Sequence, residues 1–480
     1  MQGLRLYQTQ ARFSVNRLMN SSRHPVLVLP TGTGKTKTAV GIIEDRVALG
    51  GRVYVLVPQI EIFTQWVKDL NDAGLNPGMI KDGKVMGVNR KVYVVMPLTL
   101  INMLAHIPQS MYPTEIITDE CHHSEARSWQ AIYDFFPKAT RLGLTATPQR
   151  TDGIPLSNTY TDIVSTIDMK QAIEAGYLSK PLCIVPEEYA IDVPVVDGDY
   201  DPKAQAKLLG KPEIIGDVID LYGRIFVGKP VIVACCSFEH AQEMTESFCN
   251  AGWNFKHIHS NLAPADRAAI IKDVRSGAIN GVCTVGIGIE GMDIPGLYGL
   301  IWLRRTLSLT IYLQFCGRVL RPLEGKTHGI IVDPVGNVFI HGLPELHRTW
   351  SLDGTTVQKV EHPIICPECG TANPQKAHIC TVCGAIICDS EPRREGKKRT
   401  IPSMYDGKLV AVGTNDYEVQ QAIRSMKAQA ARIRKERQAE TLEPQVLPKS
   451  ERMKLFRENM LKPQNRENFK DAIKILKGDV

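Results

Sequence analysis

Short apolar runs alternate with helical patterns along the first third of the chain. After the run Val26–Leu29, apolar residues recur at helical spacing over positions 39–47, and Ile60–Leu70 follows the next run in the same way. Strands that alternate with helices in this order predict a parallel sheet that helices cover on both faces. The strands of this sheet are expected at Val26–Leu29, Arg52–Pro58, Val92–Pro97, Thr114–His123 and Arg141–Pro148.

The same alternation returns in a later part of the chain. The segment Lys180–Gly210 is richer in Pro, Asp and Gly, as expected where the chain crosses into a second domain. Beyond it, Pro264 and Ser276–Gly277 carry the start and stop signals of one helix. We therefore expect an α/β protein with two tandem parallel-sheet domains, at residues 1–178 and 179–350. Strands of the second domain are expected at Val231–Cys236, Lys256–Ser260, Val282–Gly288, Leu297–Leu303 and Gly329–Asp333.

Length and composition agree with several globular domains. A chain of 480 residues is too long for one core, and 43% apolar with 22% charged residues is ordinary for globular protein. The N-terminus shows no basic segment followed by an apolar core, and no apolar stretch is long enough to cross a bilayer. We therefore expect a soluble, intracellular protein without a membrane partner. Eight of the twelve Cys lie outside the cluster considered below, mostly in apolar segments, which favours reduced thiols.

A glycine-containing loop, Leu29–Thr36, follows the first apolar run. Gly32 and Gly34 allow the backbone to close around phosphate oxygens, and the N-terminus of the following helix favours an anion. In this geometry Lys35 reaches the β- and γ-phosphates of a nucleotide and Thr36 ligates magnesium. The first Gly of the usual G-x-x-x-x-G-K-[ST] pattern is absent. The candidate ATP-binding residues of the loop are Thr31, Gly32, Thr33, Gly34, Lys35 and Thr36.

An acidic pair, Asp119 and Glu120, ends the fourth predicted strand. Parallel sheets place ligands at the carboxyl ends of their strands, so the pair is expected beside the phosphate loop. Asp119 can hold magnesium through water, and Glu120 can orient and deprotonate an attacking water. Alone, such a pair would more often be a helix N-cap, but the preceding loop favours catalysis. We assign no metal to His122 and His123, because adjacent His residues on a loop are more often polar linkers.

Gln314, Arg318 and Arg321 follow an i, i+4, i+7 spacing in the second domain, which predicts one face of a helix. Two guanidinium groups on one face suit a phosphoryl group that develops charge during transfer, the role of an arginine finger. In isolation, an Arg pair would instead indicate a surface salt-bridge face.

Together and in this order, the motifs resemble those of superfamily 2 helicases and translocases. The resemblance covers roughly residues 4–345 and is to the DExH-type branch with the XPB and UvsW-like enzymes. It implies two RecA-like domains, with ATP in the cleft between them and nucleic acid bound across both domains. It also implies that the protein acts in the cytoplasm of a bacterial or phage-infected cell. Arg5 and Gln8 are similar to the adenine-reading Q motif. Asp119–His122 resembles motif II, with Cys in place of the more usual Ala.

The resemblance also implies roles for residues between these motifs. Thr145 and Thr147 look like motif III, which with His122 couples hydrolysis to domain movement. Thr284–Asp293 resembles motif V, which implies that Gly291 and Asp293 contact ATP, and Gln314–Arg321 matches motif VI. Contacts to the nucleic-acid backbone are implied for Pro58, Gln59, Thr99, Ser237 and Thr284.

Two C-x-x-C-G knuckles follow the second domain, separated by ten residues. Their four thiolates can meet in a tetrahedron, which predicts a zinc ribbon over residues 362–388. A redox pair would not explain two copies. A module this small cannot bury a large hydrophobic core, and we therefore expect zinc binding to supply its folding energy. The predicted ligands are Cys366, Cys369, Cys380 and Cys383.

The basic excess of the chain lies in its last part. Residues 389–480 hold 21 Lys and Arg against 14 Asp and Glu, a net of +7, whereas the rest nets −1. This part is predicted to be a basic linker (389–414) followed by a helical tail. Contact with a polyanion is one interpretation, and a solvated helical surface is the other.

These observations predict an ATP hydrolase that uses ATP and magnesium to move along nucleic acid, with duplex or branched DNA as the preferred partner. The stretch Leu142–Gly153 resembles the DNA-acting branch, although an RNA helicase remains the nearest alternative. A second class of function is an adaptor that recruits protein partners through the zinc ribbon or tail and uses ATP only as a switch. A restriction-system motor subunit is also conceivable, but the sequence shows no clear nuclease constellation.

Overall fold

The computed structural model describes most of the first 354 residues. The described ranges are 3–150, 153–186, 193–226, 228–259, 261–285, residue 294 and 296–354, with short pieces at 364–365, 372–373, 378–379 and 409–412. Among these residues, no helix is both long enough and apolar enough to cross a bilayer. The predicted zinc ligands and helical tail lie outside the described residues.

The first lobe is built on an eight-stranded sheet with the order β4-β3-β5-β2-β6-β7-β1-β8. All neighbouring strands are parallel except β3 and β4. The strands are β1 (Pro25–Val28), β2 (Val53–Leu56), β3 (Gly78–Lys81), β4 (Lys84–Met86), β5 (Val92–Val95), β6 (Glu115–Asp119), β7 (Thr140–Thr145) and β8 (Asp162–Val164). The helices are α1 (Leu6–Asn20), α2 (Lys35–Ala48), α3 (Ile60–Asp72), α4 (Pro97–Met103), α5 (Arg127–Phe135) and α6 (Met169–Glu174), with short 3-10 turns at η1 (Leu104–His106), η2 (Gln109–Met111), η3 (Cys121–His123) and η4 (Leu156–Asn158).

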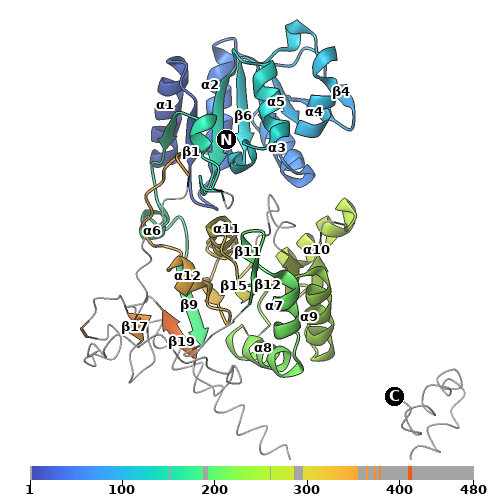
Figure 1. Ribbon diagram of the computed structural model, residues 1–480, viewed down its shortest axis with the longest axis vertical. Helices are drawn as coiled ribbons and strands as arrows, with labels where there is room; N and C mark the ends of the chain where they lie inside the picture. Colours follow the sequence, from blue (N-terminus) through green and yellow to red (C-terminus); the bar gives the residue numbers. More distant parts are fainter. Residues whose placement is uncertain are drawn as a thin grey trace, which may run out of the picture. The chain divides into compact units, whose positions relative to one another are not determined.

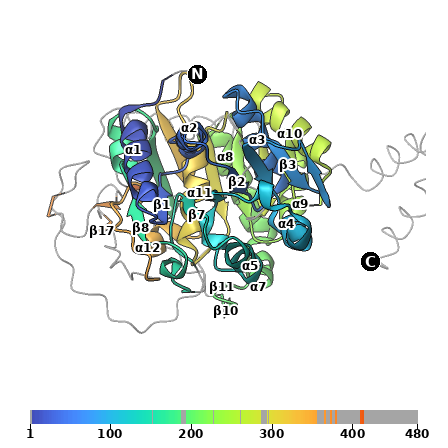
Figure 2. The same ribbon diagram turned by 90° about the horizontal axis from the view of Figure 1, so that it is seen from above.

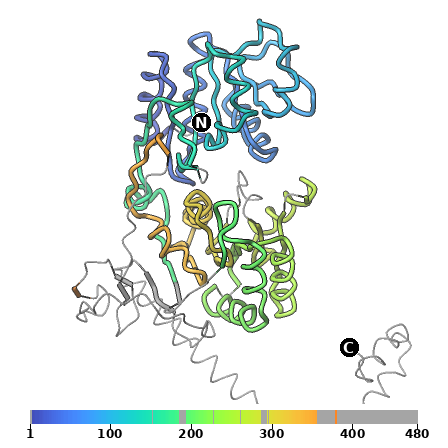
Figure 3. Tube along the Cα trace, viewed as in Figure 1, coloured from blue at the N-terminus to red at the C-terminus, as the bar shows by residue number. Residues whose placement is uncertain are grey.

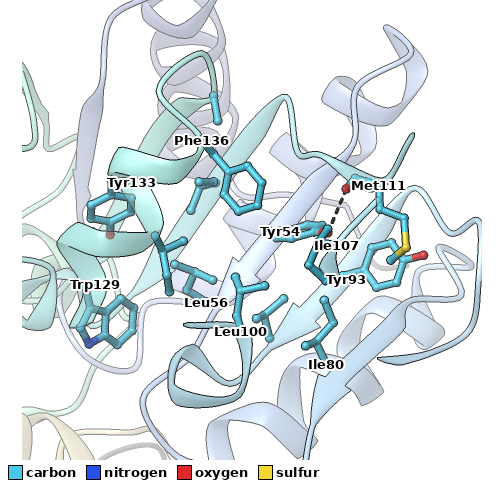
Figure 4. Close-up of a cluster of buried hydrophobic side chains, with 14 residues drawn as sticks. Tyr54, Leu56, Ile80, Tyr93, Leu100, Ile107, Met111, Trp129, Tyr133 and Phe136 are labelled. Carbon is cyan, nitrogen blue, oxygen red and sulfur yellow. Dashed lines mark hydrogen bonds between the residues drawn. The ribbon is translucent and has the colours of Figure 1, made fainter. Parts of the chain in front are cut away.

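Helices cover both faces of this sheet, as its apolar strands require. Every residue of β1, β2 and β5 is buried, because a parallel strand between two helix layers has no polar face. Figure 2 shows α1, α2 and α3 along one side of the strands and α4 and α5 along the other. Beneath α5 the core is aromatic, with Tyr54, Tyr93 and Phe136 in edge-to-face contact and the Tyr54 hydroxyl donating to the Met111 carbonyl at 2.8 Å (Figure 4).

The second lobe carries a nine-stranded sheet with the order β13-β14-β12-β15-β16-β9-β19-β18-β17. Strands β13 to β9 in this order are parallel. The strands are β9 (Lys180–Pro186), β12 (Val231–Cys235), β13 (Phe255–Ile258), β14 (Gly281–Val285), β15 (Gly299–Leu303), β16 (His328–Val332), β17 (Ile364–Ile365), β18 (Ala372–Asn373) and β19 (Leu409–Val412), beside a separate hairpin of β10 (Val195–Val196) and β11 (Asp199–Tyr200). The helices are α7 (Pro202–Leu209), α8 (Pro212–Ile225), α9 (Phe238–Asn250), α10 (Pro264–Ser276), α11 (Leu309–Val319) and α12 (Asn337–His341), several of which are labelled in Figure 1.

The α/β class with two parallel-sheet domains is therefore as predicted, but some elements differ. The segment expected to be a domain crossing contains β9, which pairs in parallel with β16. The prediction of a linker over 389–414 was wrong at Leu409–Val412, which forms β19 and pairs antiparallel with β9. This short apolar run completes the edge of β9, so its backbone groups gain partners there.

The chain returns to the first lobe after α12. Leu352 is buried in a cluster with Val26 and Tyr160, and its carbonyl accepts a hydrogen bond from the Ser157 amide at 3.0 Å. Figure 3 shows this returning segment in orange. The two lobes are consequently joined by two chain segments, one before β9 and one after α12.

Candidate active site

The loop after β1 turns sharply at two glycines before α2 begins at Lys35. Gly32 and Gly34 have φ of 88° and 85°, the left-handed region that glycine adopts without strain. A Cβ atom on Gly34 would lie 2.5 Å from the Gln8 side-chain nitrogen. The left-handed φ of Gly34 therefore favours glycine at the last position of the loop, and α2 directs its first backbone amides toward the loop.

Lys35 lies between the two carboxylates at the end of β6. Its Nζ is 3.2 Å from Asp119 Oδ1 and 3.0 Å from Glu120 Oε1, and none of the three side chains is more than 15% exposed. Burial lowers the pKa of Lys35, but the charges of Asp119 and Glu120 outweigh burial, so the pKa is raised above its ordinary value. The ammonium group of Lys35 therefore balances the negative charge of the two carboxylates.

The residues around Lys35 suit magnesium bound together with a nucleotide. Thr36 and Asp119 line one cavity of about 410 Å³ with the loop. Magnesium in such sites takes one or two protein oxygens and completes its shell with phosphates and water. Within the described part of the chain, no group of three or more His, Cys, Asp or Glu side chains could hold a metal.

Glu120 adopts a backbone conformation that is unusual for its residue type. Its φ of 48° lies in the left-handed region, between β6 and η3. The cavity that Lys35 and Thr36 line is called the nucleotide cavity below. This turn sends the chain from that cavity toward His122, whose Nδ1 is 3.5 Å from Glu120 Oε2. The Arg150 guanidinium donates to the His122 carbonyl, which ties the turn to the segment after β7.

The second lobe contributes Arg318 and Arg321 to the same cavity that Lys35 and Glu120 line. The prediction of one helix through all three motif VI residues was wrong at its end, because α11 stops at Val319 and Arg321 lies in the following turn. Pro322 comes next, and a residue before proline is disfavoured in a helix. Gln314, although buried on α11, is not among the lining residues.

Contacts between the lobes bring this turn close to the phosphate loop. A Cβ atom on Gly317 would lie 2.5 Å from Thr31 Cβ, so glycine permits the close approach of α11. Lys326 holds the turn after α11, since its Nζ donates to the carbonyls of Val319 and Arg321, the latter at 3.1 Å. Burial lowers the pKa of Lys326 to about 8, with a smaller contribution from the charge of Arg321.

Gln8 contacts the phosphate loop. Its side-chain NH₂ donates to the carbonyls of Thr33 at 3.1 Å and Gly34 at 3.4 Å, and its carbonyl accepts from the Arg5 amide. Arg5 itself stacks its guanidinium on the Tyr177 ring, 4.3 Å from the centroid. These contacts fix the loop, and adenine recognition by Arg5 and Gln8 stays a prediction.

The threonines after β7 connect the two lobes. Thr145 Oγ accepts from the Thr147 amide at 3.0 Å, and Thr147 Oγ donates to Thr310 Oγ at 2.9 Å. Thr310 is the second residue of α11 and also donates to the Gln149 carbonyl at 3.3 Å. The start of the helix that carries Arg318 is therefore bonded directly to the turn predicted to couple hydrolysis with movement.

A second cavity, of about 670 Å³, lies between the lobes and is lined by Pro58, Gln59 and His122. Sequence reasoning missed its other walls. These are Arg150 and Trp129 in the first lobe and the β10–β11 hairpin in the second. The hairpin is anchored through Asp199, which accepts from the Leu307 amide at 2.7 Å just before α11. Its Asp197-Gly198 turn was a readable sequence signal.

Other residues implied to touch nucleic acid lie elsewhere. Thr99 is on α4 and does not line the cavity. Ser237 caps α9 by accepting from the His240 amide at 3.2 Å, and Thr284 is buried in β14. The predicted positions that lie outside the described residues are Gly291, Asp293, Cys366, Cys369, Cys380 and Cys383.

Helix α3 supplies residues to the nucleotide cavity that the sequence did not single out. Gln65, Trp66 and Asp69 line it, and Gln65 donates to Asp69 Oδ1 at 2.6 Å. Burial raises the pKa of Asp69. A Trp in the buried stripe of an amphipathic helix is usually only a core residue, so no signal in the sequence distinguished Trp66.

Comparison with known families agrees with this architecture. Residues 2–150 match the family described as "Type III restriction enzyme, res subunit", and residues 210–322 match "Helicase conserved C-terminal domain". A 51.5 kDa protein of a Lactococcus phage (isolate 7-9) is 31% identical over 370 residues, which span 74% of this chain and 76% of that protein.

More distant relatives match in part. DNA 3'-5' translocase XPB2 of Sulfurisphaera tokodaii is 32% identical over 181 residues, 37% of this chain and 38% of that protein. A solved fragment assigned as an HsdR subunit of a type I restriction enzyme from Vibrio vulnificus superimposes with a TM-score of 0.56 at 21% identity, covering 71% of this chain and 67% of the fragment. The two-domain RecA-like fold is thereby confirmed, and the chain belongs to the superfamily 2 helicases and translocases, which are ATP-dependent motors on nucleic acid.

Proposed function

We propose that this chain is an ATP-driven translocase that acts on duplex or branched DNA. The observation that carries the proposal is that two cavities, each lined by both lobes, share the same connecting segments. The turn after β6 gives Glu120 to one cavity and His122 to the other, and the segment after β7 likewise gives Ala146 to one and Gln149 to the other. Chemistry in the first cavity can thereby act on a strand in the second.

In the nucleotide cavity each side chain has a separate task. Lys35 leaves the carboxylates to contact the β- and γ-phosphates, and Glu120 is then free to orient water and accept its proton. Arg318 and Arg321 approach the γ-phosphate from the second lobe and stabilise the charge that develops there. Thr36 and Asp119 would hold magnesium, which neutralises phosphate charge when it is bound.

Movement follows from the dependence of this site on both lobes. A bound triphosphate favours the arrangement in which Arg318 and Arg321 face Lys35, and loss of the γ-phosphate removes that preference. The Thr147–Thr310 hydrogen bond joins the lobes beside both cavities and would be made and broken in the cycle. A strand held by backbone contacts in the second cavity would then be advanced, with binding that weakens as salt rises.

DNA is preferred over RNA because of the relatives rather than the cavity itself. The archaeal relative is named a DNA translocase, and another relative, 27% identical over 228 residues, is a subunit of the Escherichia coli type I restriction enzyme EcoAI. The zinc ribbon at Cys366, Cys369, Cys380 and Cys383 remains part of the proposal, as a module for DNA or protein contact. The adaptor alternative requires only that ATP binding be independent of nucleic acid.

The test is an ATPase assay with single-stranded, duplex, forked and four-way-junction DNA, and with RNA. Stimulation by duplex or branched DNA, lost in Lys35→Met, supports the proposal. Equal or greater stimulation by RNA favours an RNA helicase, and indifference to every nucleic acid favours the adaptor. Displacement of a triplex-forming strand from duplex DNA separates translocation from hydrolysis alone.

A further inference from the structure

Trp66 is hydrogen-bonded to the carboxylate predicted to hold magnesium. Its indole N–H donates to Asp119 Oδ2 at 2.8 Å, and Trp66 is only 1% exposed. The other oxygen, Asp119 Oδ1, accepts from the Glu120 amide at 2.9 Å and lies 3.2 Å from Lys35 Nζ. By holding Asp119 Oδ2, Trp66 fixes the rotation of the Asp119 carboxylate.

The same helix is tied to the second lobe at its other end. Glu61, in the first turn of α3, forms an ion pair with Arg267 of α10. Both side chains are largely shielded, at 21% and 12% exposure, which makes the pair less subject to screening than a surface pair. Between these two contacts, α3 lines the nucleotide cavity with Ile62 and Gln65.

We infer that α3 links closure of the lobes to the magnesium carboxylate. Arg267 holds Glu61 when the lobes meet, and the helix, rigid over the four residues between Glu61 and Trp66, sets Trp66 against Asp119. Trp66 is then a positioning residue for magnesium binding, and the Glu61–Arg267 pair is the contact through which the second lobe favours that position. The inference rests on the proposed ATP site.

The first experiment compares Trp66→Phe with Trp302→Phe. Trp302 is equally buried, in β15 of the second lobe, and within the described part of the chain its indole N–H has no hydrogen-bond partner, so the control loses the same atoms without losing a hydrogen bond. The readout is the magnesium dependence of binding of a fluorescent, non-hydrolysable ATP analogue. Trp66→Phe should need roughly tenfold more magnesium, the loss expected for one hydrogen bond to a charged acceptor. Trp302→Phe should match the wild type.

The second experiment tests the ion pair. Glu61→Gln and Arg267→Gln should each raise the magnesium requirement about threefold, and the double variant should do no more than either alone. The exchanged pair, Glu61→Arg with Arg267→Glu, should recover most of the loss. Lys68→Gln is the matched control, because it removes an exposed pair with Asp72 from the same helix.

The outcomes separate this inference from the proposed function. A Trp66→Phe protein whose magnesium requirement equals that of Trp302→Phe overturns the role of Trp66. Additive effects of Glu61→Gln and Arg267→Gln, or no effect of either, overturn the link through α3. If the wild type hydrolyses ATP without response to nucleic acid, the proposed function fails while the magnesium measurements still decide the role of α3.

Discussion

Replacing Lys35 by Met should destabilise the first lobe as well as abolish ATP hydrolysis. The ammonium group lies 3.2 Å from Asp119 and 3.0 Å from Glu120, and these side chains are only 7% and 14% exposed. Met fills the same volume without a charge. The variant therefore leaves two adjacent, shielded carboxylates with like charges and without the cation between them.

The size of the effect follows from the burial of the three groups. Removing one partner of a buried ion pair costs about 3–5 kcal/mol, because the remaining charge stays desolvated. For a domain of this size each kcal/mol lowers Tm by roughly 2–4 °C, so a fall of about 6–20 °C is expected. Adding Glu120→Gln to Lys35→Met removes one of the two charges and should restore about half of the loss.

Thermal unfolding in the presence of a chelator measures this effect without nucleotide or metal. Lys37→Met is the matched control, because Lys37 is on the same helix and its side chain, among the described residues, donates only to the Gly3 carbonyl at 3.4 Å, in an exposed contact. It should unfold within about 2 °C of the wild type. A Lys35→Met protein that also unfolds within that range would refute the view that Lys35 neutralises the carboxylates in the nucleotide-free state.

Three further predictions concern the second lobe and its contact with the first. Thr147→Val should keep nucleotide affinity but lower DNA-stimulated turnover by about tenfold, because the bond to Thr310 is lost; a normal stimulation ratio would remove its coupling role. Arg321→Ala should bind ATP yet lose about 10³-fold or more in turnover, and unchanged steady-state hydrolysis would exclude an arginine finger. Burial lowers the pKa of His240 to about 4 from 6.5, so the unfolded state takes up its proton first and stability falls as pH drops from 6.5 to 4, by up to about 3 kcal/mol. His240→Phe should lose less stability over that window in denaturant titrations, and an unchanged pH slope would contradict this.

The residues whose positions could be predicted from the sequence are those set by local backbone geometry. The loop glycines and Lys35 come soon after β1 and the acidic pair stands at the end of β6, and the carboxyl ends of β1 and β6 lie near each other because both strands pair with β7. The five apolar strands predicted for the first lobe are present for the same reason. The apolar positions in these strands favour burial between helices.

The elements that were missed depend on partners far away in the chain. The sequence of β9 resembles a linker because it contains Pro181 and Pro186, and only its pairing with β16 makes it a strand. Trp66 reads as a core residue, since the Asp119 oxygen that it meets is 53 positions away. The end of α11 was different, because Pro322 was visible in the sequence and should have excluded Arg321 from the helix.

The left-handed conformation of Glu120 places the residues predicted for hydrolysis and for coupling on one short turn. A non-glycine residue in this region costs roughly 1 kcal/mol or more, and it persists only where its surroundings require it. Here the turn lets Glu120 face the cavity that Lys35 lines while His122, two residues on, faces the second cavity. The distance between the two cavities is thus bridged by one short turn that contains this residue and is held by Arg150 on one side and by Lys35 on the other. In the proposed mechanism, departure of Lys35 toward a nucleotide would change one of the two contacts that hold this turn, and coupling would need no extended pathway.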